Sequence, residues 1–327
     1  MRAPWFWFRE AGLLSMLLMP ATLLWRLGGA IRSARMTPKK VPVPVICIGN
    51  LTAGGAGKTP MVAAWSLRLA SQGRTVAVVS RGYGGRLMGP HKVDPAKDRA
   101  EDVGDEPLML AQMATVWVAR DRAAGAEAAA RDGAEIVLLD DGFQNPGIAK
   151  DLSVLVVDAE QGFGNRRIIP AGPLREPVVV GFSRADRVVL IGLLEERRRA
   201  ADRWPELEGA LPACLVSVET GIDLSGQPVV AFAGIGRPEK FFGLLRSLGA
   251  RLAAAHPFPD HHVYDERVIV RMLREAAEKG AMLITTEKDA IKLPERYRCE
   301  VLALPVRLEL EDWTELDRLV DTLAPRH

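Results

Sequence analysis

A glycine-rich run that ends in lysine and threonine is the clearest chemical signal in this 327-residue sequence. It follows the apolar segment 41–48 and precedes residues 60–69, which have helical character. Backbone N–H groups in such a turn, and the positive end of the following helix, favour phosphate binding. Lys58 has the reach to contact β- and γ-phosphates, and the Thr59 hydroxyl suits Mg²⁺. The predicted nucleotide-binding residues are Thr52, Ala53, Gly54, Gly55, Ala56, Gly57, Lys58 and Thr59.

The loop departs from the usual phosphate-loop pattern at its first position, where Thr52 replaces a glycine. The remaining core, from Gly54 to Thr59, is intact, and the strand–loop–helix context is the expected one. Partitioning-type ATPases have a similar loop with a lysine just before the paired glycines. That position is Ala53 here, which argues against this group.

Two carboxylates directly follow the apolar segment 135–139. In a phosphate-loop enzyme, the acidic residues at the end of such a strand bind Mg²⁺ directly or through water. Asp140 and Asp141 are therefore candidate metal residues. Helix capping is the alternative for an aspartate after a strand, but the presence of Lys58 and Thr59 favours the metal.

Acids and histidines elsewhere in the chain are candidates for proton transfer. Residues 102–107 place several acids at a strand-to-helix junction, where they either cap the helix or supply a general base. His261 and His262 form either a surface pair or half of a catalytic dyad, in which a histidine meets an acid of the first domain across a cleft. Residues 285–289 either line that cleft or form a capped turn.

Two further segments carry arginines suited to anions. Arg81 and Tyr83 lie in a glycine-containing turn after the strand 75–80. Arg81 either holds phosphate while Tyr83 packs on substrate, or the segment is a plain turn. Arg175 lies in the proline-rich run 170–177, which is either a structural loop or a clamp that binds an anion through two hydrogen bonds.

The elements that position these residues alternate between short apolar strands and helices, which predicts a parallel sheet covered on both faces. Ligands of such sheets bind beyond the carboxyl ends of the strands. The predicted strands are 75–80, 115–119, 135–139, 153–158 and 187–191, and the predicted helices are 106–113 and 122–131.

A second α/β unit is predicted after a charged helix at 192–204, a strand at 213–219 and a boundary at 221–227. Its predicted elements are strands 228–234 and 282–286, helices 238–248 and 266–279, an extended segment 301–310 and a final helix 313–323. The predicted fold class is therefore α/β. A phosphate-loop domain with a parallel sheet spans 37–218, and a smaller α/β domain spans 219–327. The final helix belongs to the second domain or packs back on the first.

The N-terminal residues 1–36 differ in kind from the rest. Residues 11–25 are almost wholly apolar, aromatic residues precede them, and basic residues flank them, Arg2, Arg9, Arg26 and Arg35 among them. The apolar run is shorter than the roughly 20 residues of a spanning helix. We predict a helix that lies on an anionic membrane surface. A short or tilted span and a core-packing helix are alternatives, and a signal peptide fits poorly because export would separate the phosphate loop from ATP.

Composition narrows the possible partners. A net charge of +2 indicates no general affinity for nucleic acid, and the three cysteines are too scattered for a zinc site. A reducing, cytosolic setting fits both observations, and no obligate protein partner is inferred.

Together these motifs resemble those of the tetraacyldisaccharide 4′-kinase family of Gram-negative bacteria. The matching segments occur in family order over nearly the whole chain. They are residues 49–60, 80–84, 104–107, 139–144, 170–177, 232–238, 258–261 and 286–292.

The resemblance implies Mg²⁺-dependent transfer of the ATP γ-phosphate to the 4′-hydroxyl of a tetraacylated glucosamine disaccharide 1-phosphate, a step of lipid A biosynthesis. It places the enzyme at the cytoplasmic face of the inner membrane. By motif position it implies that Asp105 is the catalytic base, assisted by His261. It adds supporting or substrate-binding residues, which are Glu106 beside the metal and Tyr83, Arg122, Gln144 and Arg175. A membrane-associated nucleotide switch without a lipid acceptor is the alternative function.

The sequence departs from the family at Asn145, where many members have histidine. Asparagine keeps the capacity for hydrogen bonding but does not titrate near neutral pH. We therefore expect this position to act by orientation.

Overall fold

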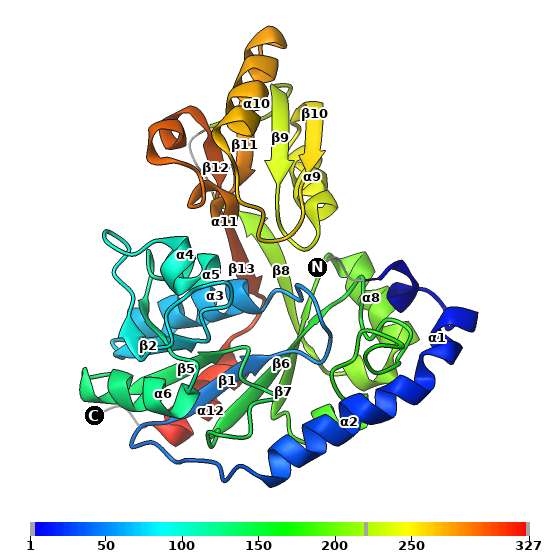
Figure 1. Ribbon diagram of the computed structural model, residues 1–327, viewed down its shortest axis with the longest axis vertical. Coiled ribbons are helices and arrows are strands. Elements are labelled where there is room, and N and C mark those ends of the chain that lie inside the picture. Colours follow the sequence, from blue (N-terminus) through cyan, green and yellow to red (C-terminus); the bar gives the residue numbers. More distant parts are fainter. Residues whose placement is uncertain (1–3, 219–221, 325–327) are drawn as a thin grey trace.

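The protein forms two lobes, each built on its own β-sheet (Figure 1). The computed structural model describes residues 4–218 and 222–324, so Arg2 and Gly221 lie outside the described residues. The large sheet has nine strands in the order β13-β8-β7-β6-β1-β5-β2-β4-β3, and the small sheet has four in the order β10-β9-β11-β12. The prediction of an α/β fold with a larger and a smaller sheet is confirmed.

The strands of the large sheet are parallel except at its two edges, where β3 pairs antiparallel with β4 and β13 with β8. The sheet is thus mixed and not wholly parallel as predicted. Its strands are β1 (Val45–Gly49), β2 (Val76–Ser80), β3 (His91–Lys92), β4 (Thr115–Val118), β5 (Ile136–Asp140), β6 (Leu152–Asp158), β7 (Arg187–Ile191), β8 (Leu211–Ser217) and β13 (Val306–Leu310). The central strands β1, β5 and β6 are buried along their whole length and mostly apolar, because both faces of a parallel sheet are covered.

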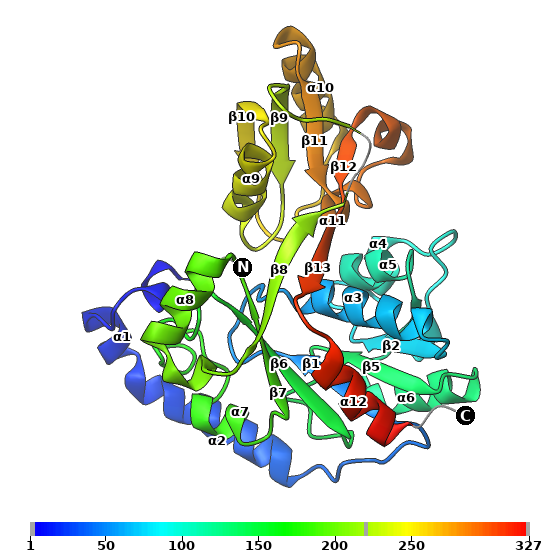
Figure 2. The same ribbon diagram turned by 180° about the vertical axis from the view of Figure 1, so that it is seen from behind.

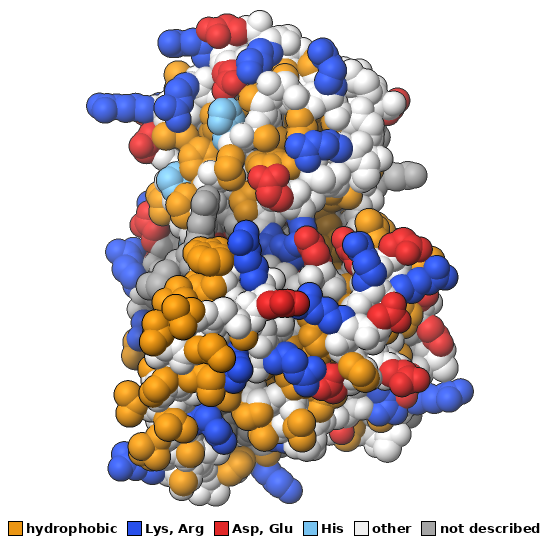
Figure 3. All heavy atoms as spheres, turned by 90° about the vertical axis from the view of Figure 1, so that its right-hand side faces the viewer, with side chains coloured by type: hydrophobic (Ala, Val, Ile, Leu, Met, Phe, Trp, Pro, Cys, Tyr) orange, Lys and Arg blue, Asp and Glu red, His pale blue; other side chains and the backbone are white. Residues whose placement is uncertain are grey.

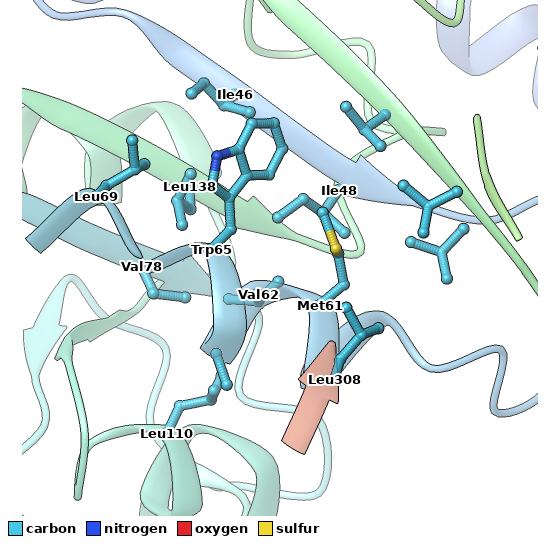
Figure 4. Packing of buried hydrophobic residues seen from close by; sticks show 14 of the residues in the cluster. Ile46, Ile48, Met61, Val62, Trp65, Leu69, Val78, Leu110, Leu138 and Leu308 are labelled. Carbon is cyan, nitrogen blue, oxygen red and sulfur yellow. The ribbon is translucent and has the colours of Figure 1, made fainter. Parts of the chain in front are cut away.

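Helices cover both faces of the large sheet. Trp65 and Met61 of α3 pack against the sheet residues Ile46 and Ile48 on one face (Figure 4). The other face holds a second core that includes Phe143 and Trp204. The helices of this lobe are α3 (Lys58–Ser71), α4 (Ala100–Val103), α5 (Asp105–Leu110), α6 (Arg122–Arg131), α7 (Val178–Phe182), α8 (Leu194–Arg203) and α12 (Thr314–Leu323).

The small sheet is parallel throughout. Its strands are β9 (Pro228–Ala233), β10 (Arg251–Pro257), β11 (Met282–Thr286) and β12 (Leu302–Leu304), and its helices are α9 (Pro238–Ser247), α10 (Glu266–Glu278) and α11 (Glu287–Ala290). The edge strand β10 is absent from the sequence prediction. Its core, Leu252 to His256, contains three alanines, and alanine is depleted in strands, so the segment carries little strand signal.

Two neighbouring strands join the lobes. The chain leaves the large sheet through β8 and returns through β13, which pairs antiparallel with it from Val306↔Ser217 to Leu310↔Ala213 (Figure 2). The final helix α12 then lies on the large sheet, where Leu316 and Val320 share a core cluster with Leu308. The extended segment predicted in the second unit therefore contributes one strand to each sheet.

This placement makes the C-terminal helix part of the large lobe's core, and Leu316→Ala should destabilise that lobe. Leu316 is fully buried, so the substitution should lower the free energy of unfolding by roughly 2–5 kcal/mol. Thermal melting monitored by circular dichroism measures the effect. Arg318→Ala, on the exposed side of the same helix, is the matched control. Equal melting temperatures for the two variants would contradict the assignment.

The N-terminal segment contains two helices where one was predicted, α1 (Leu13–Leu17) and α2 (Met19–Ala34). The second begins at Met19, has Pro20 in its first turn, where proline is favoured, and continues past the apolar run 11–25 to Ala34. Three side chains fasten the segment to the proline-rich loop: Trp7 Nε1 donates to the Pro170 carbonyl (3.0 Å), Ser15 Oγ to Ala171 (2.7 Å) and Trp25 Nε1 to Arg175 (3.0 Å).

One face of this segment is apolar and exposed. The side chains are Leu13, Leu14, Met16, Leu17, Leu23, Leu24, Trp25, Leu27 and Ile31, and they gather on one side of the molecule (Figure 3). We call this set the N-terminal apolar face. None of the helices in the described ranges is long and apolar enough to cross a membrane.

Candidate active site

The phosphate loop joins β1 to α3 and has a backbone that its glycines permit. Gly54 and Gly57 have φ angles of +126° and +87°, which residues with a Cβ rarely adopt. A Cβ on Gly57 would also lie 2.6 Å from Ile191 Cδ1. The Ala53 N–H donates to the Pro173 carbonyl (2.8 Å), so the proline-rich segment supports the loop. The loop is thus built to bring backbone close to a ligand at the start of α3.

Two aspartates at the end of β5 stand beside the loop in different environments. Asp140 is buried, and its Oδ1 atom has no hydrogen-bond partner among the described residues. Burial, with repulsion from Glu106 and Asp141, raises the pKa of Asp140 to about 7. Burial also tends to raise the pKa of Asp141, but Lys58 and Arg175 outweigh it and the pKa is lowered.

The contacts of Asp141 explain this difference. Arg175 donates to both of its carboxylate oxygens, at 2.7 and 3.1 Å, and Lys58 Nζ lies 3.8 Å from Oδ1. Gln144 in turn accepts from Arg175 (3.1 Å) and donates to the Asn50 carbonyl (2.9 Å). Asp141 therefore orients the cations of the site, whereas Asp140 keeps a free oxygen.

Of the four residues predicted to hold Mg²⁺, Thr59, Asp140 and Glu106 fit a hard cation, whereas Asp141 is paired with Arg175 and Lys58. Thr59 Oγ1 donates to Glu106 Oε2 (3.4 Å), which brings α3 and α5 together. Carboxylate and hydroxyl oxygens are suitable ligands for Mg²⁺, and Asp140 Oδ1, which has no hydrogen-bond partner in the described part of the chain, is available to coordinate it. Within residues 4–218 and 222–324 no group of three or more His, Cys, Asp or Glu could hold a metal ion. Mg²⁺ commonly uses only one or two carboxylates, together with substrate phosphates.

Asp105 and His261 meet across the boundary between the lobes. Asp105 begins α5 and is almost fully buried, and His261 Nδ1 lies 2.8 Å from its Oδ2 and 3.0 Å from its Oδ1. Burial opposes ionisation of Asp105, but His261 and Lys288 lower its pKa overall. The hydrogen bond to Asp105 raises the pKa of His261. The Tyr83 ring lies 5.3 Å from the His261 ring.

The structure also separates the two neighbouring histidines. His262 stacks on Phe258, with ring centroids 4.6 Å apart, and packs edge-on to Tyr264. It belongs to the small lobe's aromatic packing, and burial lowers its pKa. Asn145, which we expected to act by orientation, accepts a hydrogen bond from the Gly147 N–H (2.8 Å) and shapes its own turn.

A single cleft of about 2650 Å³ collects nearly all of the predicted site residues. Arg81 is exposed on its wall, and Arg122 is buried with Nη2 3.4 Å from the Asp141 carbonyl. Thr52 and Asp105 do not line the cleft and are buried beside it. The predicted loop, metal and proton-transfer residues thus converge.

Sequence reasoning missed a second set of contacts between the lobes. Arg237 Nη1 and Lys240 Nζ of the small lobe lie 2.9 and 2.5 Å from the carboxylate of Asp158, and Arg237 also pairs with Glu160. The available signal was Asp158 itself, which ends an apolar strand as Asp140 does. Its cationic partners carry no local motif, so only the fold reveals them.

A glycine-rich loop between a strand and a helix, an acidic strand beside it and a carboxylate–histidine pair define the class of phosphate-loop phosphotransferases. Comparison with known proteins names the member of this class. The family model for tetraacyldisaccharide-1-P 4′-kinase matches residues 14–324, and the chain belongs to this family. The predictions of a kinase and of a step in lipid A biosynthesis are confirmed.

Individual relatives cover the chain almost completely. The tetraacyldisaccharide 4′-kinase of Jannaschia sp. is 50% identical over 333 residues and covers 100% of both chains. That of Rhodospirillum centenum is 53% identical over 333 residues, covering 99% of this chain and 96% of its own. Among solved structures, LpxK from Aquifex aeolicus in complex with ATP is 29% identical, with a TM-score of 0.74 over 95% of this chain and 100% of its own.

Proposed function

We propose that this chain transfers the γ-phosphate of ATP, bound with Mg²⁺, to the 4′-hydroxyl of tetraacyldisaccharide 1-phosphate. The product would be the 4′-phosphorylated lipid A precursor. The observation that carries this proposal is the contact of Asp105 with His261, at 2.8 Å, beside the cleft of the phosphate loop. A base held beside a triphosphate site suits activation of a hydroxyl acceptor.

Phosphoryl transfer depends mainly on alignment and on neutralisation of charge. The N–H groups of the loop and the positive end of α3 would bind the phosphates, and Lys58 would neutralise their charge. Arg175 holds Asp141, whose carboxylate faces Lys58 and so orients it. Thr59, Asp140 and Glu106 would hold Mg²⁺, which supplies further charge neutralisation when bound. Arg81 and Arg122 add positive charge along the cleft.

Asp105 is suited to accept the proton of the sugar hydroxyl. Its pKa is lowered by His261 and Lys288 despite burial, so the carboxylate is ionised at neutral pH. The Nδ1–H of His261 donates to this carboxylate and fixes its direction. Tyr83, exposed at the cleft wall and close to His261, is placed to contact the acceptor.

The N-terminal apolar face would hold the cleft at an anionic membrane surface, where the acyl chains of the acceptor lie. Exposed Arg9 and Arg26 accompany the apolar side chains, a combination that favours anionic lipid. The cleft reaches this segment, since Leu24 and Trp25 of α2 line it. We place this contact at the cytoplasmic face of the inner membrane, where ATP is available.

Removing residues 1–36 should abolish binding to vesicles that contain anionic lipid, as measured by co-sedimentation. Because Trp7 and Ser15 pack on the large lobe, a double substitution, Leu13→Glu with Leu17→Glu, provides a version that leaves those contacts in place. Burial of each leucine contributes about 1.5–3 kcal/mol, so loss of both should lower vesicle affinity by more than about 100-fold. Val263→Glu, an exposed apolar position of the small lobe, is the control. Undiminished binding by the double variant would refute the membrane contact.

Transfer itself is tested with γ-labelled ATP, Mg²⁺ and tetraacyldisaccharide 1-phosphate. The proposal predicts label in the lipid, and chelation of Mg²⁺ with EDTA should stop its appearance. Release of free labelled phosphate with no labelled lipid would favour a nucleotide switch and overturn the proposal.

A further inference from the structure

The ammonium group of Lys288 lies between carboxylates that come from both lobes. Lys288 is in the first turn of α11, in the small lobe, and its side chain is mostly buried. Its Nζ atom is 2.9 Å from Glu106 Oε1 and 3.8 Å from Asp105 Oδ2, both on the large lobe. The same atom is 3.2 Å from Asp260 Oδ1, in the loop of the small lobe that carries His261. Lys288 therefore contacts groups on each side of the Asp105–His261 hydrogen bond.

The contact with Asp260 reaches the backbone of His261. Asp260 Oδ1 accepts a hydrogen bond from the His261 N–H (3.1 Å) as well as from Lys288. His261 has a φ of +59°, a left-handed conformation that is uncommon outside glycine. A carboxylate that is itself held in place can maintain this turn and keep the imidazole directed at Asp105.

Electrostatics indicates why a cation is required at this point. Asp105, Glu106 and Asp260 bring three negative charges together at a partly buried boundary between lobes. Like charges in such an environment repel strongly. Lys288 lies within 4 Å of all three and offsets this repulsion, which would otherwise separate the loop of His261 from α5.

The backbone of Lys288 is fixed in the small lobe by its neighbour Asp289. This aspartate is fully buried and accepts from the Gly234 N–H (2.9 Å), the Tyr264 hydroxyl (3.0 Å) and the Thr286 hydroxyl (2.7 Å). The sequence left residues 285–289 as either cleft lining or a capped turn. They are both, because Thr286 to Lys288 line the cleft and Thr286 caps α11. The Lys288 side chain thus extends toward the large lobe from a backbone that these hydrogen bonds hold in place.

We propose that Lys288 is a positioning residue that holds Asp105 and His261 together across the lobe boundary. It does so by binding Asp105 and Glu106 on one lobe and Asp260 on the other. The inference rests on the proposed function, in which Asp105 accepts the proton of the acceptor hydroxyl. It assigns a positioning role to Lys288, one of the two lysines in residues 286–292, whose only part in the mechanism above is to lower the pKa of Asp105.

Kinetics of Lys288→Met test this role. Misplacement of a catalytic group by about 1 Å can cost about 100-fold in rate, so kcat should fall by about that factor. The KM for ATP should stay within about threefold of wild type, because Lys288 positions the base Asp105 and does not bind the nucleotide. Lys288→Arg, which keeps the charge, should recover most of the rate. Lys279→Met, which removes an ion pair with Glu275 within the small lobe, is the control and should keep wild-type kcat.

Three kinetic outcomes would overturn the proposal. They are a kcat for Lys288→Met within threefold of wild type, a loss confined to the KM for ATP, and an equal loss in the Lys279→Met control. Failure of Lys288→Arg to recover any rate would also count against it, since a cation at this position would then be insufficient.

A second measurement needs no turnover and separates this inference from the proposed function. The distance between the lobes can be measured with spin labels at two exposed positions, Glu101 on α4 and Arg271 on α10. The substitutions Cys214→Ser and Cys299→Ser first remove the more accessible native thiols. Pulsed electron–electron double resonance should give a longer or broader distribution of label-to-label distances for Lys288→Met than for wild type. An unchanged distribution would overturn the positioning role, even if wild-type protein failed to phosphorylate the lipid.

Discussion

Asp105→Asn should lower kcat about 1,000-fold while ATP binding stays at the wild-type level. General base catalysis contributes roughly 10²–10⁴-fold, and the amide of asparagine cannot accept the proton. Asparagine keeps the size of aspartate, and its Oδ1 can still accept from His261, so the lobe contact survives. Steady-state transfer of label to lipid gives kcat, and calorimetric titration with a non-hydrolysable ATP analogue gives the affinity.

Asp102 offers a matched control from the same acidic segment. It pairs with Arg86 at the surface, 2.7 Å away, and does not approach His261. Asp102→Asn should therefore retain wild-type kcat to within about twofold, because surface ion pairs contribute little. If Asp105→Asn retained a comparable rate, Asp105 would be removed as the base. A loss of nucleotide affinity in Asp105→Asn would instead assign it to the nucleotide site.

Lys58→Met should reduce kcat/KM for ATP by about 100–1,000-fold, the range found when one preorganised charge or donor at a developing anion is removed. The side chain is mostly buried beside Asp141, 3.8 Å away, with no other ion pair among the described residues. Methionine fills a similar volume without charge. Unlike Asp105→Asn, this variant should also bind the non-hydrolysable analogue more weakly, because Lys58 contacts the phosphates in the bound state as well.

The control for Lys58→Met is Lys92→Met, which removes a surface ion pair with Asp132 far from the loop. It should leave kcat/KM unchanged. Melting temperatures of both variants show whether folding is intact. A Lys58→Met enzyme with kcat/KM within threefold of wild type would mean that the loop binds something other than the reacting phosphates.

Much of the candidate site could be predicted because its signals are local. The strand, the glycine loop and the helix start all lie within residues 45–58, and the positive φ angles at Gly54 and Gly57 are ones that glycine readily adopts. Asp140 and Asp141 follow an apolar strand directly, so their place at the carboxyl edge of a sheet is a consequence of chain geometry. The longer helices and strands could be predicted for the same reason, because their signals are also local in the sequence.

Contacts between segments that are distant in sequence could be predicted only where the resemblance to the family's motifs implied them. Asp105 and His261 are 156 residues apart, and no periodicity connects them. The strand β13 returns to the large sheet, whereas β12 just before it stays in the small one, because of pairing with β8 that the sequence does not encode locally. The edge strand β10 was missed because its alanines carry little propensity and its position alone determines its conformation.

By itself, the sequence determined a phosphate-binding loop, an acidic strand and an α/β architecture with an apolar N-terminal segment. The tertiary structure decided which of two adjacent histidines meets Asp105, which aspartate stays unpaired for a cation and where Lys288 reaches. Local motifs depend on backbone conformation within a few residues, and residue type strongly restricts that conformation. Partners across a cleft depend on how two separately packed sheets are joined, which is settled by burial and charge only once the whole chain is folded.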